Sequence, residues 1–167
     1  GDGAGAAVLS RIEESGRGLI ASVLGAEGSG AKDLYLVQEE RTRTFERAEP
    51  VVPRIAMNGQ NVYNFAVKSI TVLVQRLLHQ AAYRLDDFAW IVPHQANARI
   101  VQAAAKRLGA PEDKFYLNMA EYANTSAASI PIALDEMNTK GLLKKGDLVM
   151  LLGFGAGLTY GAQAIRW

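Results

Sequence analysis

The chain contains no cysteine among its 167 residues. It therefore has no disulfide framework, no thiolate metal site and no thiol nucleophile of its own. Because disulfides are excluded, a reducing compartment, the cytoplasm, is the expected location. Only two histidines are present, and neither stands at ligand spacing from another histidine or an acid, so the sequence predicts no metal site.

The chain also has little net charge and no long apolar run. A formal charge of +1 argues against extensive nucleic-acid binding. No apolar stretch approaches the roughly 20 residues that a membrane-spanning helix needs. The composition, 49% hydrophobic and 21% charged, is typical of a globular protein, and the length suits a single domain over residues 1–167 with a core of its own.

Hydrophobic spacing predicts strands and helices in the order ββαβαβαββ. The alternation predicts a mixed, mostly parallel five-stranded sheet flanked by helices. The first two strands should form an antiparallel hairpin, and the last two should pair through a glycine-rich turn. The expected strands cover residues 5–9, 18–24, 88–92, 115–117, 148–152 and 159–165, and the expected helices cover residues 58–82, 97–108 and 127–139.

One expected helix is apolar on every side at its start. Between Ala127 and Leu134 only Ser129 is polar, and Pro131 fits there only in the first helical turn. A helix without a polar stripe is buried all round, as between two sheets. Together with a beginning that lacks methionine, this predicts that the chain is the second part of a longer protein.

Three turns carry the candidate functional groups. His94 follows an apolar strand that stops at Pro93, and Asn124 precedes a helix about thirty residues later. Open α/β sheets place their ligand sites just beyond such strand ends. Two neutral hydrogen-bond donors there suit a developing oxyanion. The third turn is Gly153-Phe154-Gly155-Ala156-Gly157.

Each of these groups also has a structural interpretation. Asn124 is either a helix cap or, if Ser126 caps the helix, a donor that faces the cleft. The glycines serve either a hairpin that needs positive φ or a close approach of the Ala156 backbone N–H to a substrate oxygen. The exposed cations Arg99, Lys106 and Arg107 form either a solvated helix face or a seat for phosphates or an acidic carrier protein.

The combination of three motifs resembles one family. Pro93-His94-Gln95-Ala96-Asn97, Asn124-Thr125-Ser126-Ala127-Ala128-Ser129 and the glycine-rich turn resemble the C-terminal half of the β-ketoacyl-acyl-carrier-protein synthases of type III, in the thiolase-like superfamily. The resemblance covers essentially the whole chain. It implies half of a five-layer αβαβα sandwich whose N-terminal half, with the catalytic cysteine, lies outside this sequence.

The resemblance implies an acyltransferase that condenses an acyl-CoA primer with malonyl-acyl-carrier protein to start fatty-acid synthesis. His94 and Asn124 match the donors that hold the malonyl thioester oxygen, and Ala156 matches the backbone donor to the acyl oxyanion. The segment from Met57 to Tyr63 resembles the lining of the CoA tunnel. Its contact positions there are Gly59 and Tyr63, and Asn97 matches a residue that binds the pantetheine arm.

The partners that the resemblance implies are acyl-CoA, an acidic acyl carrier protein docked on Arg99, Lys106 and Arg107, and a second copy in a homodimer. No cofactor is implied. Asn64 replaces a further basic residue of the docking surface. The chain alone should be inactive because it lacks the nucleophile. The alternatives are a non-catalytic thiolase-like module that binds CoA or a carrier protein, and a related acyltransferase of secondary metabolism.

Overall fold

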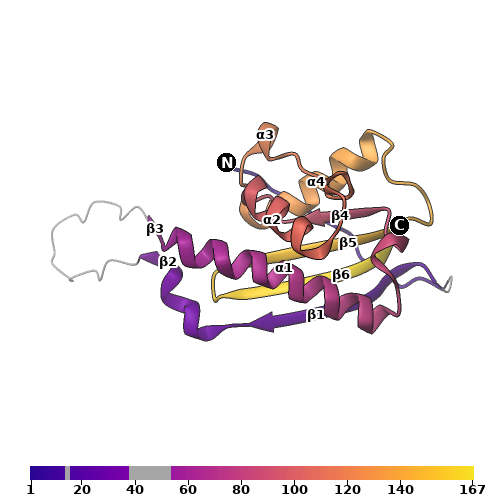
Figure 1. Ribbon diagram of the computed structural model, residues 1–167. Helices are drawn as coiled ribbons and strands as arrows, with labels where there is room; N and C mark the ends of the chain where they lie inside the picture. Colours follow the sequence, from indigo (N-terminus) through magenta and orange to yellow (C-terminus); the bar gives the residue numbers. More distant parts are fainter. Residues whose placement is uncertain (14–15, 38–53) are drawn as a thin grey trace.

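The computed structural model describes residues 1–13, 16–37 and 54–167 (Figure 1). Its main sheet has the strand order β1-β6-β5-β4, and a small second sheet pairs β2 with β3. Strands β4 and β5 are parallel, whereas β1–β6, β5–β6 and β2–β3 are antiparallel. The strands are β1 (Gly18–Ala26), β2 (Leu34–Val37), β3 (Arg54–Met57), β4 (Trp90–Pro93), β5 (Leu148–Gly155) and β6 (Thr159–Arg166).

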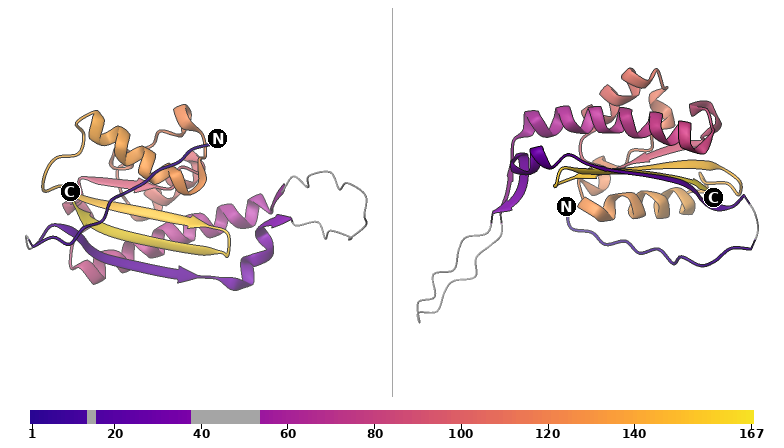
Figure 2. Two further views of the ribbon diagram at one scale, coloured as in Figure 1. Left: turned by 180° about the vertical axis from the view of Figure 1, so that it is seen from behind. Right: turned by 90° about the horizontal axis from the view of Figure 1, so that it is seen from below.

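The helices form one layer on each side of this sheet (Figure 2). The long helix α1 (Gly59–Ala81) and α2 (Ala98–Leu108) cover one face, and α4 (Ser129–Thr139) covers the other. A one-turn helix, α3 (Met119–Tyr122), lies in the connection between α2 and α4. No helix in the described part of the chain has the length and hydropathy needed to cross a bilayer.

Side chains of β5 and of its neighbour β4 alternate between the two layers. Met150 and Leu152 of β5 belong to the core under α1 and α2, whereas Val149 packs with Val92 of β4 under α4. This alternation follows the two-residue period of a strand. The two strands are therefore buried on both faces, and the turns that follow them are held by a rigid support.

The expected helices over residues 58–82 and 97–108 are confirmed, and capping interactions explain where they begin and end. The Asn58 side chain accepts a hydrogen bond from the backbone N–H of Asn61 (3.2 Å). Asn97 caps α2 in the same way through the N–H of Arg99 (2.9 Å). Helix α2 ends at Gly109, whose φ of 64° is a left-handed conformation that glycine adopts without strain.

The predicted hairpin between residues 5–9 and 18–24 is wrong. Residues 1–13 contain no strand, and the apolar side chains of Val8 and Leu9 are 97% and 95% exposed. Strand β1 pairs instead with β6, over a register from Gly18–Arg166 to Ala26–Thr159. The apolar run at 5–9 predicted a strand, but a local pattern does not indicate which strand pairs with β1. That partner is β6, which follows more than 130 residues later.

The predictions of five strands and of a mostly parallel sheet are also wrong. Within residues 1–13, 16–37 and 54–167 the main sheet has four strands and one pair of parallel strands, because the β5–β6 and β1–β6 pairings are both antiparallel. The expected strand at 115–117 is reduced to one parallel bridge between Phe115 and Ile91. Strand pairing stops there because the Gln95 side chain takes the backbone groups that a longer strand would use. It donates to the Tyr116 carbonyl (3.1 Å) and accepts from the Asn118 N–H (2.9 Å).

The helix expected at 127–139 is present in slightly shorter form. A 3-10 turn covers Ser126–Ala128, and α4 follows from Ser129 with Pro131 in its first turn, as predicted. In this chain α4 is buried along the side that faces the sheet, and Ile130 and Leu134 pack only partly against the core. Burial of its other side between two sheets stays a prediction.

Candidate functional site

A cavity of about 1080 Å³ lies beyond the carboxyl ends of β4 and β5. Its lining comes from segments that are far apart in the sequence: the end of β1, the β2–β3 sheet, the start of α1, and the turns after β4, before α4 and after β5. Six of the residues selected from the sequence line this one cavity: Gly59, Tyr63, His94, Asn97, Asn124 and Ala156.

His94 occupies the first position after β4. Its backbone N–H continues the parallel ladder by donating to the carbonyl of Leu152 (2.7 Å), so the turn is anchored to β5. Its ring meets Phe154 edge-on, with 5.3 Å between ring centroids. Burial lowers the pKa of His94 below the ordinary 6.5, because the charged form is poorly solvated there. The imidazole is therefore neutral at neutral pH.

Ser129 holds one side of this imidazole. Its Oγ lies 2.7 Å from His94 Nδ1 and also accepts a hydrogen bond from the backbone N–H of Gln95 (3.2 Å). The Nδ1 atom is thereby occupied, and Nε2 is the ring nitrogen left for a ligand. Ser129 was not predicted as a site residue, although it is the only polar residue in the apolar run before Asp135.

Asn124 and Asn97 share one geometry. Each side-chain oxygen accepts a hydrogen bond from the backbone N–H two residues later, at Ser126 and Arg99 respectively, with the same distance of 2.9 Å. The two interpretations of Asn124 are therefore compatible: its carbonyl oxygen caps the turn, while its amide nitrogen has no partner within the described residues. Ser126 does not replace it as the cap.

The glycine-rich turn combines a conformational and a steric role. Only Gly157 needs positive φ (131°), and a Cβ there would lie 2.6 Å from the Thr159 side chain. Gly153 and Gly155 belong to β5 and line the cavity, and a Cβ on either would meet no atom within 4 Å. These glycines thus leave the space beside Ala156 open.

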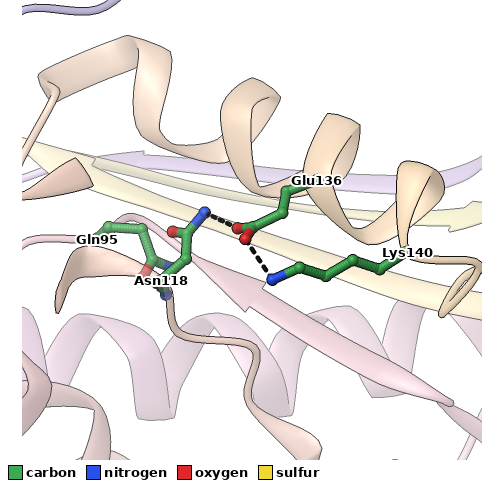
Figure 3. Close-up of polar contacts among 4 residues, drawn as sticks. All are labelled: Gln95, Asn118, Glu136 and Lys140. Carbon is green, nitrogen blue, oxygen red and sulfur yellow. Dashed lines mark hydrogen bonds and ion pairs between the residues drawn. The ribbon is translucent and has the colours of Figure 1, made fainter. Parts of the chain in front are cut away.

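A buried polar network holds the turn after β4 in place. Gln95 is 1% exposed, and its amide donates to the carbonyls of Pro93 (2.8 Å) and Tyr116 while its oxygen accepts from the Asn118 N–H. The Asn118 side chain donates to Glu136 on α4 (2.7 Å), and Glu136 pairs with Lys140 (Figure 3). The network joins β4, the 116–118 segment and α4.

Within this network the hydrogen bond from Lys140 lowers the pKa of the Glu136 carboxyl, and the bond from Asn118 acts in the same direction. Both donors favour the ionised form over the protonated form. Glu136 is therefore a fixed negative charge at neutral pH, and it orients Asn118 beneath the turn that carries His94.

The opposite side of the cavity is apolar, and we call it the apolar wall. It consists of large hydrophobic side chains on β1 and the β2–β3 sheet that line the cavity and remain exposed: Leu24, Tyr35, Leu36, Ile55 and Met57. Of these residues only Met57 was expected at the site, as the first residue of the segment that resembles the lining of the CoA tunnel. The other four were not predicted from the sequence, because the short runs of β2 and β3 carry no motif.

Comparison with known proteins assigns the chain to a family. The family model described as 3-oxoacyl-[acyl-carrier-protein (ACP)] synthase III C terminal matches residues 78–167. The chain belongs to this family. It is 47% identical to the β-ketoacyl-[acyl-carrier-protein] synthase III of Clostridium novyi (strain NT) over 99% of its own length and 51% of that protein.

Solved structures of synthase III proteins share the fold. The 3-oxoacyl-(acyl carrier protein) synthase III from Pseudomonas aeruginosa superimposes with a TM-score of 0.83 at 35% identity, covering 94% of this chain and 47% of that one. The β-ketoacyl-[acyl carrier protein] synthase III from Thermus thermophilus gives 0.81 at 40% identity, over 92% and 47%. The chain thus spans about half the length of the synthase III proteins it matches, and the thiolase-like mixed α/β fold is confirmed.

The three cations that resemble the family's docking surface lie outside the cavity. Arg99, Lys106 and Arg107 are exposed on α2, and their side chains make no ion pair with any described residue. The Tyr63 hydroxyl lies 3.5 Å from the Arg99 carbonyl, which places the start of this face beside the cavity. In this synthase III half, the structure therefore separates an interior polar site from an exterior basic face.

Proposed function

We propose that this chain is the half of a β-ketoacyl-acyl-carrier-protein synthase III that holds the malonyl group and stabilises the negative charge formed when it loses carbon dioxide. The whole protein would condense an acyl-CoA primer with malonyl-acyl-carrier protein and so start fatty-acid synthesis. The acyl group would be carried by a cysteine of the other half, because this chain contains none.

One observation carries the proposal. His94 and Asn124, from turns thirty residues apart, line one cavity, and each has one side-chain polar atom, Nδ1 and Oδ1 respectively, bound inside the protein. The groups that remain, the imidazole Nε2 and the amide Nδ2, suit an oxygen that becomes negative. Neutral donors fixed in advance stabilise such an oxygen more than the uncharged thioester, which is the requirement for catalysis.

The proposed reaction needs only these groups and the missing cysteine. The bond between C2 and the carboxylate of the malonyl thioester breaks, carbon dioxide leaves, and the electron pair forms an enolate whose oxygen accepts from His94 and Asn124. C2 then attacks the acyl thioester on the cysteine. The Ala156 N–H would hold the resulting oxyanion until it collapses, which releases the thiolate and the β-ketoacyl product.

The remaining assignments belong to the same proposal. Gly59, Tyr63 and Asn97 would contact the pantetheine arm in the cavity, and the basic face of α2 would seat an acidic carrier protein. No cofactor is required besides the acyl-CoA and malonyl-carrier substrates. The full-length protein would be a cytoplasmic homodimer.

The test separates the two half-reactions in the protein that contains this chain. Each of His94→Ala and Asn124→Ala should slow release of carbon dioxide from malonyl-carrier protein by roughly 10²–10³-fold, the usual cost of one oxyanion donor. Acylation of the cysteine by acyl-CoA should change little. His79→Ala, which alters the other, exposed histidine on α1, is the matched control. Equal loss of both half-reactions would contradict the assignment.

The chain of 167 residues gives a second test. Incubated with acetyl-CoA, it should gain no covalent acetyl group, since it has no thiol to accept one. Intact mass spectrometry checks this directly. A stoichiometric acetyl adduct would place the nucleophile within this chain and overturn the division of labour between the two halves.

A further inference from the structure

Ser129 is buried at the first position of α4, with a side chain that is 2% exposed. Its Oγ has two partners in the described part of the chain: the backbone N–H of Gln95 at 3.2 Å and the Nδ1 of His94 at 2.7 Å. Both come from the turn after β4. Ser129 thus bridges the start of α4 to the first two residues beyond that strand.

The two contacts of Ser129 Oγ determine which atom donates and which accepts in each. A backbone N–H only donates, so Oγ must accept from Gln95. The hydroxyl hydrogen then needs an acceptor, and among the described residues Nδ1 is the only one within reach. Nδ1 therefore accepts and carries no hydrogen in the neutral ring, which leaves the ring hydrogen on Nε2.

We infer that Ser129 is a positioning residue that fixes His94 in the tautomer with its hydrogen on Nε2, the nitrogen left for a ligand in the cavity. Ser129 acts through His94, because its hydroxyl is already bound to that ring and to the Gln95 N–H. The inference rests on the proposed function only for its purpose: a donor at Nε2 is what a thioester oxygen requires. The tautomer itself is a property of this chain.

The structure suggests why a serine is needed at this place. Burial keeps the imidazole neutral, and a neutral imidazole exchanges its hydrogen between the two nitrogens unless a neighbour favours one of them. With the other tautomer, Nε2 would be an acceptor and would repel the lone pairs of the substrate oxygen. A hydroxyl that is already bound by Gln95 as an acceptor favours donation to Nδ1.

The tautomer can be measured on the 167-residue chain by long-range ¹H–¹⁵N correlation NMR after labelling with ¹⁵N-histidine. The chain has two histidines, and the exposed His79 serves as an internal reference. At a pH well above the ordinary histidine pKa of about 6.5, His94 should show an unprotonated Nδ1 and a protonated Nε2. A protonated Nδ1 in the unchanged chain would overturn the inference without any variant.

Variants then test whether Ser129 is the cause. Ser129→Ala should shift the His94 tautomer ratio toward protonated Nδ1 by roughly five- to tenfold, the effect of losing one hydrogen bond of ordinary strength. Ser129→Thr keeps the hydroxyl and should restore the ratio. Ser69→Ala, which removes a buried hydroxyl on α1, is the matched control and should leave the His94 signals unchanged.

An unchanged tautomer ratio in folded Ser129→Ala would also overturn the inference. The proposed function is judged separately, by carbon dioxide release in His94→Ala. If the tautomer depends on Ser129 while that release is unaffected, the positioning role stands and the proposed reaction falls. If the release fails as expected while the tautomer ignores Ser129, the reverse holds.

Discussion

The cavity has two sides that are built on opposite principles. One side is held by hydrogen bonds within the protein, and we call its five residues the polar rim. His94, Asn124 and Ser129 line the cavity, whereas Gln95 and Asn118 support the turn after β4 without lining it. Gln95 and Ser129 are 1% and 2% exposed. On the apolar wall, Leu24 and Ile55 are 75% and 72% exposed, and their hydrocarbon side chains can form no hydrogen bond that would fix them.

This contrast shows which part of the site the chain completes by itself. The polar rim has its orientation fixed within the chain, because the side-chain oxygens of Gln95, Asn124 and Ser129 each accept a hydrogen bond from a backbone N–H. The apolar wall exposes hydrophobic side chains to water, which is unfavourable for a single molecule. Exposed apolar patches of this kind usually mark interfaces. Changes in the polar rim should therefore alter folding stability, and changes in the apolar wall should alter association.

The largest effect is expected at Gln95. Gln95→Ala would leave the carbonyls of Pro93 and Tyr116 and the N–H of Asn118 without their partner. Each buried group left unpaired costs about 1–3 kcal/mol, so the free energy of unfolding should fall by about 3 kcal/mol or more. Urea unfolding followed by circular dichroism measures this. Gln60→Ala, at an exposed position, should stay within about 0.5 kcal/mol of the parent chain.

The next effect concerns the apolar wall. Leu36 of β2 lies directly opposite Ile55 of β3, so the pair Leu36→Glu and Ile55→Lys places opposite charges side by side and preserves the net charge. The chain should self-associate through the wall. Each large apolar side chain contributes about 1.5–3 kcal/mol when buried, so the double variant should weaken association by at least roughly tenfold.

Light scattering over a range of concentrations gives the association constant. Leu19→Glu is the matched control, because Leu19 is 61% exposed on β1 but does not line the cavity. A parent chain that stays monomeric at high concentration would contradict the assignment of the wall as an interface, and so would equal effects of Leu19→Glu and the double variant.

A smaller effect is expected on the basic face of α2. Exposed ion pairs contribute about 0.2–1 kcal/mol each. In the protein that contains this chain, Arg99→Glu with Lys106→Glu should raise KM for malonyl-carrier protein a few-fold, more strongly at low salt, with little effect on acyl-CoA. Arg76→Glu with Lys145→Glu reverses two exposed charges elsewhere and should leave KM unchanged. If both pairs act alike, α2 is an ordinary solvated face.

The smallest effect concerns Glu136 and depends on pH. Because its pKa is lowered in the folded chain, the carboxylate contributes stability above the ordinary pKa of about 4.5, and this contribution is lost as the pH falls through the lowered pKa. Unfolding measured across this range should show Glu136→Gln less stable than the parent at neutral pH, with the difference shrinking on acidification. Glu121→Gln, at an exposed site, should follow the parent curve.

Two residues of the polar rim, His94 and Asn124, were accessible from the sequence. His94 and Asn124 stand next to strong local signals, a strand that stops at proline and a turn that opens a helix, so their positions could be predicted without the fold. Their hydrogen-bond partners could not. That Ser129 reaches Nδ1, or that Gln95 ends the ladder at Tyr116, depends on where α4 and the 116–118 segment pack.

The apolar wall was not accessible in this way. Leu36 and Ile55 are brought together by the pairing of two four-residue strands. Such short runs show no hydrophobic period that distinguishes them from loops. The β1–β6 pairing was missed for a related reason, because antiparallel partners far apart in the sequence are chosen by tertiary packing. Local pattern predicted the helices well and the strand partners poorly.

The parallel pairing of β4 with β5 affects the order in which the molecule folds. Strands β4 and β5 are separated by residues 94–147, so their contact closes a long loop whose entropy must be offset before the pairing gains anything. Contacts of such separation slow folding. His94 and Asn124 both lie inside that loop, and the Leu152 carbonyl that anchors His94 lies on its far strand. The helices can therefore form early, but the donor pair is assembled only when the loop closes, so a ligand-competent site forms no earlier than the pairing of β4 with β5.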